Sequence, residues 1–199
     1  MLEITWFAIW GMLWAVYFML DGFDLGAGTL VPVLGKTEAD RRVIYHSIGP
    51  VWDGNEVWLI TAGAVTFAAF PGAYAAIFSA LYSPLMLILV ALIVRGVSVA
   101  FRTELDTPRW RKVWDVTTVL SSVLAAFLLG VAFANIFKGV PVGAEGAYHG
   151  NLLGLLNPYG ILGGLLFVFL FVVHGALWIA NKSESDLHER AASLAGKMW

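Results

Sequence analysis

The sequence predicts an all-α fold, a polytopic bundle of transmembrane helices. Of the 199 residues, 59% are hydrophobic and only 13% are charged, whereas a soluble domain has about 25% charged residues because it needs a wet surface. The mean hydropathy is +0.78. The apolar stretches are hydrophobic all round and do not alternate with a period of two, which argues against barrel strands. We therefore predict an integral membrane protein.

Five stretches are long enough to cross a membrane, since a helical span needs about 20 residues with a rise of about 1.5 Å each. They cover residues 4–24 (with apolar sequence continuing to Leu34), 51–70, 73–101, 113–137 and 155–181. A sixth span is expected to begin at Ala191. The N-terminus lacks a basic region and a small-residue cleavage site, so we interpret it as a first span and not as a signal peptide. A single integral membrane domain is expected over residues 1–199.

Basic residues are concentrated in alternate loops, and this bias predicts the orientation of the chain. The loops after the first, third and fifth spans hold ten of them, whereas the opposite side holds only Lys138. The ten are Lys36, Arg41, Arg42, Arg102, Arg109, Arg111, Lys112, Lys182, Arg190 and Lys197. Because cytoplasmic loops have the excess of positive charge, we predict that these loops are cytoplasmic and that the N-terminus lies outside.

Five ionisable residues are predicted to lie within the membrane spans, close to the cytoplasmic face of the membrane. The second span would be too short if it began after Glu56, so Asp53 and Glu56 belong to it. The first span brings Asp21 and Asp24 to the same level, and the third brings Arg95. An ionised group at a helix centre costs about 2.5–3.5 kcal/mol, and neighbouring carboxylates in a low-dielectric space repel one another. We therefore expect these residues to meet in a polar seam suited to proton transfer.

Two other interpretations of these charges stay open. Charged residues in the last turn of a membrane helix often only cap the helix and reach to water, which applies above all to Asp21 and Glu56. Asp24, Asp53 and Arg95 together favour a paired buried cluster. Even so, the pairing could be structural, because buried charges need partners whether or not protons move.

Other kinds of site find little support. The net charge of −2 argues against nucleic acid as a partner, and without cysteine there is no disulfide or thiolate site. His174 is the only histidine well inside a predicted span, whereas a low-spin haem needs two axial ligands. Phosphate loops, zinc spacings and nucleophile constellations are missing from the sequence. We therefore expect this chain to bind no haem or metal and to contribute no catalytic residue.

Several motifs resemble those of a known family. They are the run Asp-Gly-Phe-Asp-Leu-Gly-Ala-Gly at 21–28, the run Trp-Asp-Gly-Asn-Glu-Val-Trp at 52–58, the segment 131–141 and Leu-Asn-Pro-Tyr-Gly at 156–160. Together they are similar to subunit II of the cytochrome bd quinol oxidases, and the resemblance covers essentially the whole chain. Members of that family are longer, with about eight membrane helices, so the chain matches the N-terminal part of the family pattern.

The resemblance implies a place in a prokaryotic respiratory chain. It suggests a heterodimer, in the inner cell membrane, with a subunit I that has haems b and d and the quinol site. Small accessory subunits occur in some such complexes. The complex oxidises quinol and reduces oxygen to water, taking protons from the cytoplasm. Subunit II has no haem in this family, although in some members it holds a structural quinone.

The resemblance also implies roles for the charged residues. By their place in the motifs, Asp24 and Asp53 are the residues most closely tied to a proton channel at the subunit interface, and Asp21, Glu56 and Arg95 line or support it. Two other functions remain alternatives: an ion-coupled membrane transporter, and a purely structural membrane partner. The transporter is disfavoured because the chain has no internal repeat and its acids lie near one face.

Overall fold

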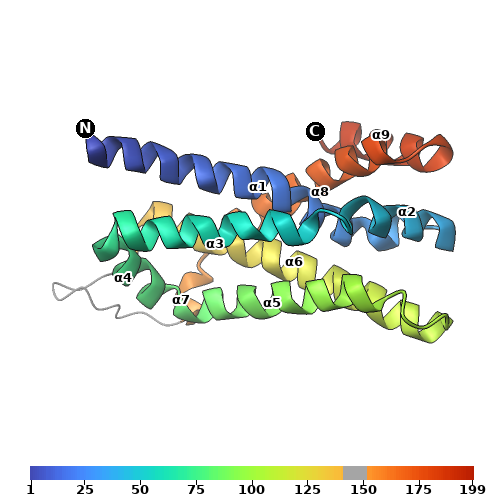
Figure 1. The fold of residues 1–199 in the computed structure, drawn as a ribbon, viewed down its shortest axis with the longest axis horizontal. Helices are drawn as coiled ribbons and strands as arrows, with labels where there is room; N and C mark the ends of the chain where they lie inside the picture. Colours follow the sequence, from blue (N-terminus) through green and yellow to red (C-terminus); the bar gives the residue numbers. More distant parts are fainter. Residues whose placement is uncertain (141–151) are drawn as a thin grey trace.

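The computed structural model describes residues 1–140 and 152–199, and every regular element in these two ranges is a helix. Figure 1 shows the long helices lying side by side along one axis. The helices, in chain order, are α1 (Leu2–Leu34), α2 (Glu38–Ile48), α3 (Trp52–Ala69), α4 (Pro71–Ala80), α5 (Tyr82–Phe101), α6 (Pro108–Lys138), α7 (Leu152–Leu155), α8 (Pro158–Lys182) and α9 (Ser185–Met198). The predicted all-α bundle is confirmed.

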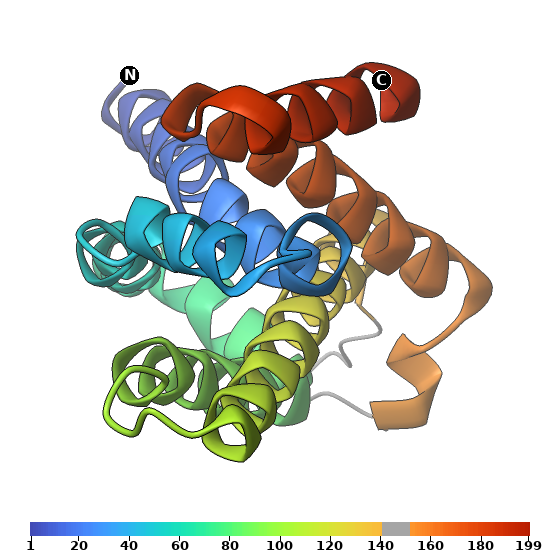
Figure 2. The same cartoon turned by 90° about the vertical axis from the view of Figure 1, so that its right-hand side faces the viewer.

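Four of the described helices are long and apolar enough to cross a membrane: α1, α5, α6 and α8. The helix that corresponds to the second predicted span, α3, has 18 residues and polar side chains in its first turns, including Asp53, Asn55 and Glu56. It nevertheless packs lengthwise against α1 within the bundle. Short helices α2 and α9 lie at the end of the bundle where α1 finishes and α3 begins (Figures 1 and 2).

The third predicted span, 73–101, is wrong as one continuous helix. It is divided at Leu81 into α4 and α5. Pro84, in the first turn of α5, has no N–H to donate to the carbonyl of Ala80, so a regular helix cannot continue through this point. The 20 residues of α5 still reach about 30 Å.

Helix caps account for most other differences from the predicted boundaries. The fifth span begins at Pro158 instead of residue 155, because the Asn157 side chain accepts a hydrogen bond from the Gly160 N–H (3.1 Å) and caps α8. The fourth begins at Pro108 instead of residue 113, after the cap at Thr107. Helix α2 was not predicted; its sequence signal is a capping box between Thr37 and Asp40.

The helix in which a sixth span was expected from Ala191 begins six residues earlier, at Ser185, and with 14 residues it is not one of the described helices long and apolar enough to cross a membrane. It is amphipathic: Leu187, Ala191 and Ala195 are buried on one face, in an apolar cluster with residues of α1, α2 and α8. Its other residues include exposed acidic and basic side chains such as Asp186 and Lys197. This pattern is typical of a helix that covers one side of a bundle.

The second half of α1 is the most enclosed part of the bundle, since α3, α6 and α8 all pack against α1. Close approach of α1 and α8 depends on Gly26 and Gly175. A Cβ at Gly26 would overlap the backbone carbonyl of Phe171, and one at Gly175 would overlap the backbone of α1 at Gly26 and Ala27. The segment with the two aspartates of α1 is therefore held in the centre of the protein.

Candidate functional site

Three helices deliver the predicted charged residues to one buried place. Asp21 and Asp24 are three residues apart on α1, so their side chains share a face. Glu56 comes from the second turn of α3, and Arg95 from the last two turns of α5. Asp21, Asp24 and Arg95 are each 1% exposed or less. Four of the five charged residues that the sequence prediction brought together therefore meet in the structure.

Arg95 is the centre of this buried cluster. Its Nη2 lies 2.8 Å from Asp21 Oδ1 and 2.6 Å from Glu56 Oε1. The Trp52 ring covers the guanidinium at 5.9 Å. Because the side chain of Glu56 is 22% exposed whereas that of Asp21 is 1% exposed, the cluster has one open side and one closed side. Two carboxylates that share one guanidinium are strongly held, and a charge left alone at this depth would be very unfavourable.

Asp24 is held by a hydrogen bond to an amide and not, like Asp21 and Glu56, by an ion pair with Arg95. Its Oδ2 accepts a hydrogen bond of 2.7 Å from the side-chain amide of Asn55, which is also 3.3 Å from the Leu20 carbonyl. No cation of the described residues lies within ion-pair distance of Asp24. Its carboxylate is therefore buried beside a neutral amide donor. Asn55 was missed by the sequence prediction, although it lies inside the Trp-Asp-Gly-Asn-Glu-Val-Trp run.

Asp53 does not join the buried cluster, contrary to expectation. Its side chain is exposed on this chain, while that of Asn55 is buried against α1. Successive residues of a helix are about 100° apart, so Asp53 is rotated about 200° away from Asn55. It is still close enough to interact electrostatically with Glu56. Asp53 therefore lies beside the open side of the cluster.

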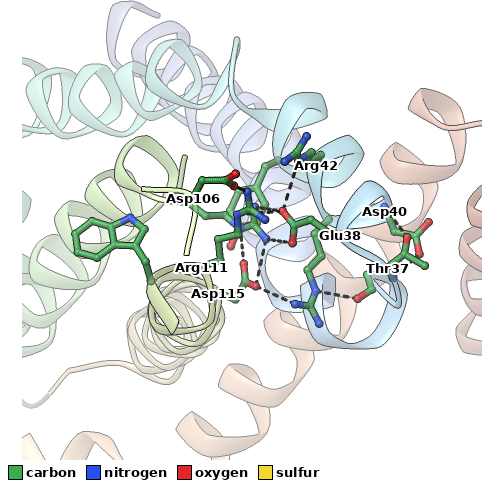
Figure 3. Close-up of polar contacts among 12 residues, drawn as sticks. Thr37, Glu38, Asp40, Arg42, Asp106, Arg111 and Asp115 are labelled. Atoms are coloured by element: carbon green, nitrogen blue, oxygen red, sulfur yellow. Dashed lines mark hydrogen bonds and ion pairs between the residues drawn. The ribbon is translucent and has the colours of Figure 1, made fainter. Parts of the chain in front are cut away.

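A second ionic cluster, nearer the end of the bundle, was not predicted. Arg102, 1% exposed, lies at the C-terminus of α5. Its Nε is 2.5 Å from Asp115 Oδ1 on α6, and its Nη1 is 3.1 Å from Glu38 Oε1 on α2. Figure 3 shows Glu38 and Asp115 extending from these two helices toward a shared group of arginine side chains. Partial burial opposes ionisation of Glu38, but its hydrogen bonds to Arg102 outweigh this and lower its pKa.

Further arginines complete this second cluster. Arg41 is 3.3 Å from Asp115, and Arg111 and Arg42 each lie 3.6 Å from Glu38. Arg111 also pairs with Asp106 (Figure 3). The signal that could have revealed the cluster is the Thr-Pro pair at 107–108, which starts α6 five residues before the predicted span and so places Asp115 about two turns inside the helix.

Helix α9 is tied to the same end of the bundle by Arg190. Its Nη1 donates to the carbonyl oxygen of Leu34, the last residue of α1 (2.5 Å), and its Nη2 pairs with Asp40 (3.0 Å). The C-terminal carbonyls of a helix favour a cation. Arg190 therefore connects α9 to α1 and α2.

No described group of three or more His, Asp or Glu side chains is arranged to hold a metal ion. His174 packs edge-on against the Phe23 ring, with ring centroids 5.7 Å apart. The arrangement found in the described ranges is a pair of ionic clusters. Such ion pairs hold helices together, and a buried carboxyl group outside them, like that of Asp24, is chemically able to bind and release a proton.

Comparison with known proteins agrees with the motifs. The family model described as "Cytochrome bd terminal oxidase subunit II" matches residues 2–199. The chain is 40% identical, over 197 residues, to the "Cytochrome bd ubiquinol oxidase subunit 2" of Bacillus subtilis, covering 99% of this chain and 58% of that protein. It is 38% identical, over 198 residues, to the "Cytochrome bd-I ubiquinol oxidase subunit 2" of Escherichia coli K12, covering 98% of this chain and 52% of that protein. The chain therefore spans about half the length of the curated relatives it matches, and it belongs to the cytochrome bd terminal oxidase subunit II family.

Proposed function

We propose that this chain is part of the non-haem subunit of a quinol-oxidising terminal oxidase, and that its buried cluster is part of a proton path open to the cytoplasm. The observation that supports this most directly is Asp24, a fully buried carboxylate that forms no ion pair with any described cation. Two of its relatives are named as subunits of ubiquinol oxidases. Reducing oxygen to water consumes protons, so such a complex needs a route for them.

The charges of the cluster suit this task. One guanidinium, that of Arg95, interacts electrostatically with three carboxylates: Asp21, Glu56 and Asp24. Arg95 pairs with the first two, which leaves Asp24 as the group best able to take up and release a proton. A set composed only of matched ion pairs would hold the helices together but would have no free proton acceptor.

The exposure of the acids favours a direction for the path. Asp53 is exposed and Glu56 is part-exposed at the start of α3, whereas Asp21 and Asp24 are closed in by α1 and its neighbours. Protons would enter at Asp53 and Glu56. The excess of Lys and Arg at the same end supports a cytoplasmic location, with the N-terminus outside.

The redox chemistry would lie elsewhere in the complex. In this proposal a partner, subunit I, holds the haems and binds quinol and oxygen. The present chain would stabilise that partner in the prokaryotic inner membrane, and a structural quinone and small accessory subunits are consistent with its membership of the family. Lipid would contact the exposed apolar faces of its helices.

The test is Asp24→Asn in the oxidase complex, with the full-length subunit. Because Asn keeps the shape of the side chain but cannot carry a proton, oxygen consumption should fall while the haem spectrum and subunit composition stay normal. The matched control is Asp186→Asn, since the Asp186 side chain is 80% exposed on α9. Loss of the haems together with the complex would favour the purely structural function. Solute uptake by vesicles with only this subunit would favour the transporter.

A further inference from the structure

A stripe of hydrogen-bonding side chains extends from the buried cluster toward the N-terminus of α1. Its members are Trp10, Trp14, Tyr17, Asp21 and Asp24, with spacings of four, three, four and three residues. Such spacings keep all five on one face of the helix. At the far end, the Trp10 indole donates a hydrogen bond to Thr66 Oγ1 of α3 (2.7 Å). In the middle of the stripe, Tyr17 is completely buried.

Polar atoms without partners gather at this place. In the described ranges, eight buried side-chain nitrogen or oxygen atoms have no hydrogen-bond partner in the protein, and five of them belong to Tyr17, Asp21, Asp24 and Arg95. They are Tyr17 Oη, Asp21 Oδ2, Asp24 Oδ1, and Arg95 Nε and Nη1. Tyr17 lies one turn from Asp21, its hydroxyl is near enough to the Asp21 carboxylate for hydrogen bonding to contribute to their interaction, and it also interacts electrostatically with Arg95. Three of the side chains with such atoms, those of Tyr17, Asp21 and Arg95, therefore interact with one another beside the ion pair.

The chemistry of these atoms fits a water molecule. Asp21 Oδ2 can only accept a hydrogen bond when ionised, the Arg95 nitrogens can only donate, and the Tyr17 hydroxyl can do both. Buried polar atoms are nearly always satisfied, by protein or by ordered water, and a buried water typically has about three partners. Tyr17, Asp21 and Arg95 provide such a set.

We propose that an ordered water molecule binds between Tyr17, Asp21 and Arg95, and that Tyr17 is a positioning residue that extends the proton path along α1, away from the basic end. The proton step rests on the proposed function, whereas the water site does not. The water would accept from Arg95, donate to Asp21 and exchange a hydrogen bond with Tyr17. It would give the buried cluster a hydrogen-bonded neighbour on the Tyr17 side, away from the entry at Glu56.

The first test is a structure of the complete oxidase at a resolution that reveals water. Density within hydrogen-bond distance of Tyr17 Oη, Asp21 Oδ2 and an Arg95 nitrogen is the expected result. A direct hydrogen bond between Tyr17 and Asp21, with no density between them and Arg95, would overturn the water site. This measurement needs no variant, so it remains decisive even if the variants assemble poorly.

The second test is Tyr17→Phe in the complete complex. Phe keeps the ring that packs edge-on against Trp14 (centroids 6.0 Å apart) and removes only the hydroxyl. Oxygen consumption should fall about fivefold, the factor that corresponds to one lost hydrogen bond, with a changed pH profile and a normal haem spectrum. The control is Tyr159→Phe, which removes a hydroxyl from a residue that is 51% exposed. It should change neither the rate of oxygen consumption nor its pH profile.

The outcomes separate this inference from the proposed function. If Tyr17→Phe has the wild-type rate and pH profile while Asp24→Asn slows the enzyme, the role of Tyr17 is refuted and the proton path stands. If Asp24→Asn also has the wild-type rate, the proton path itself is refuted.

Discussion

Arg95 and Arg102 lie seven residues apart on one face of α5, and each inserts a buried guanidinium between carboxylates of other helices. Seven residues correspond to about two helical turns, or about 10 Å along the axis. Ser98, fully buried, lies between them. One helix face therefore organises both ionic clusters: the inner one with α1 and α3, and the outer one with α2 and α6.

Arg95→Leu should prevent stable folding of the subunit. The substitution leaves Asp21 and Glu56 buried without a counter-charge, which costs about 3–5 kcal/mol. The yield of assembled complex and its thermal unfolding temperature measure this loss. Arg109→Leu, at an exposed position after α5, is the control and should leave both unchanged. Equal behaviour of the two variants would mean that the ion pairs around Arg95 contribute little.

Asp115→Asn should destabilise the outer cluster, by about 3 kcal/mol, because Arg102 then keeps only Glu38 as its anionic partner. Unlike Asp24→Asn, it should leave the rate of each correctly assembled enzyme unchanged, since the outer cluster holds helices together. Thermal unfolding and turnover per haem distinguish the two effects. A slow but thermally stable Asp115→Asn enzyme would instead place the outer cluster on the proton path.

The pH dependence of stability should include a contribution from Glu38. Its pKa is lowered from the usual 4.5, because Arg102 outweighs the effect of partial burial. The ionised carboxylate therefore stabilises the fold at any pH above about 4.5, and this stabilisation is lost as the pH falls through the folded pKa. The stability difference between wild type and Glu38→Gln should be largest at neutral pH and shrink in acid. Chemical unfolding at several pH values measures it, with the exposed Glu104→Gln as control. A difference that grows in acid would contradict the assignment.

Gly26→Ala should separate α1 from α8. The added methyl group would overlap the Phe171 carbonyl, which is backbone and cannot rotate away. Overpacking of this kind typically costs about 1–3 kcal/mol, which a lowered unfolding temperature would reveal. Gly11→Ala is the matched control on the same helix, since no described atom lies within 4 Å of a Cβ there. Similar unfolding temperatures for the two variants would show that α1 and α8 can move apart freely.

The predicted orientation can be tested with single cysteines, because this chain contains none. Glu104→Cys lies in the basic loop after α5 and Lys138→Cys at the opposite end of α6, and both positions are exposed. A membrane-impermeant thiol reagent added to intact cells should modify the cysteine at 138 and spare the one at 104. The reverse pattern would contradict the positive-inside assignment and would place the candidate proton entry outside the cell.

The sequence by itself determined the fold class and which charged residues lie at the same level along the bundle. Hydropathy and the length of a span indicate how far along its helix each residue lies. The charged residues of three helices could therefore be assigned to one level: Asp21, Asp24, Glu56 and Arg95. The same information does not state which way a side chain points around the helix axis.

Only the tertiary structure decided that direction. Packing of α3 against α1 turns Asn55 inward and Asp53 outward, although both belong to the same short motif. It also brings Arg102, which was assigned to a loop, and Asp115, near the start of the fourth predicted span, into a buried ion pair. The rotation of a helix is set by which neighbour buries which face. That choice depends on contacts between segments far apart in the chain, which hydropathy along the sequence does not record.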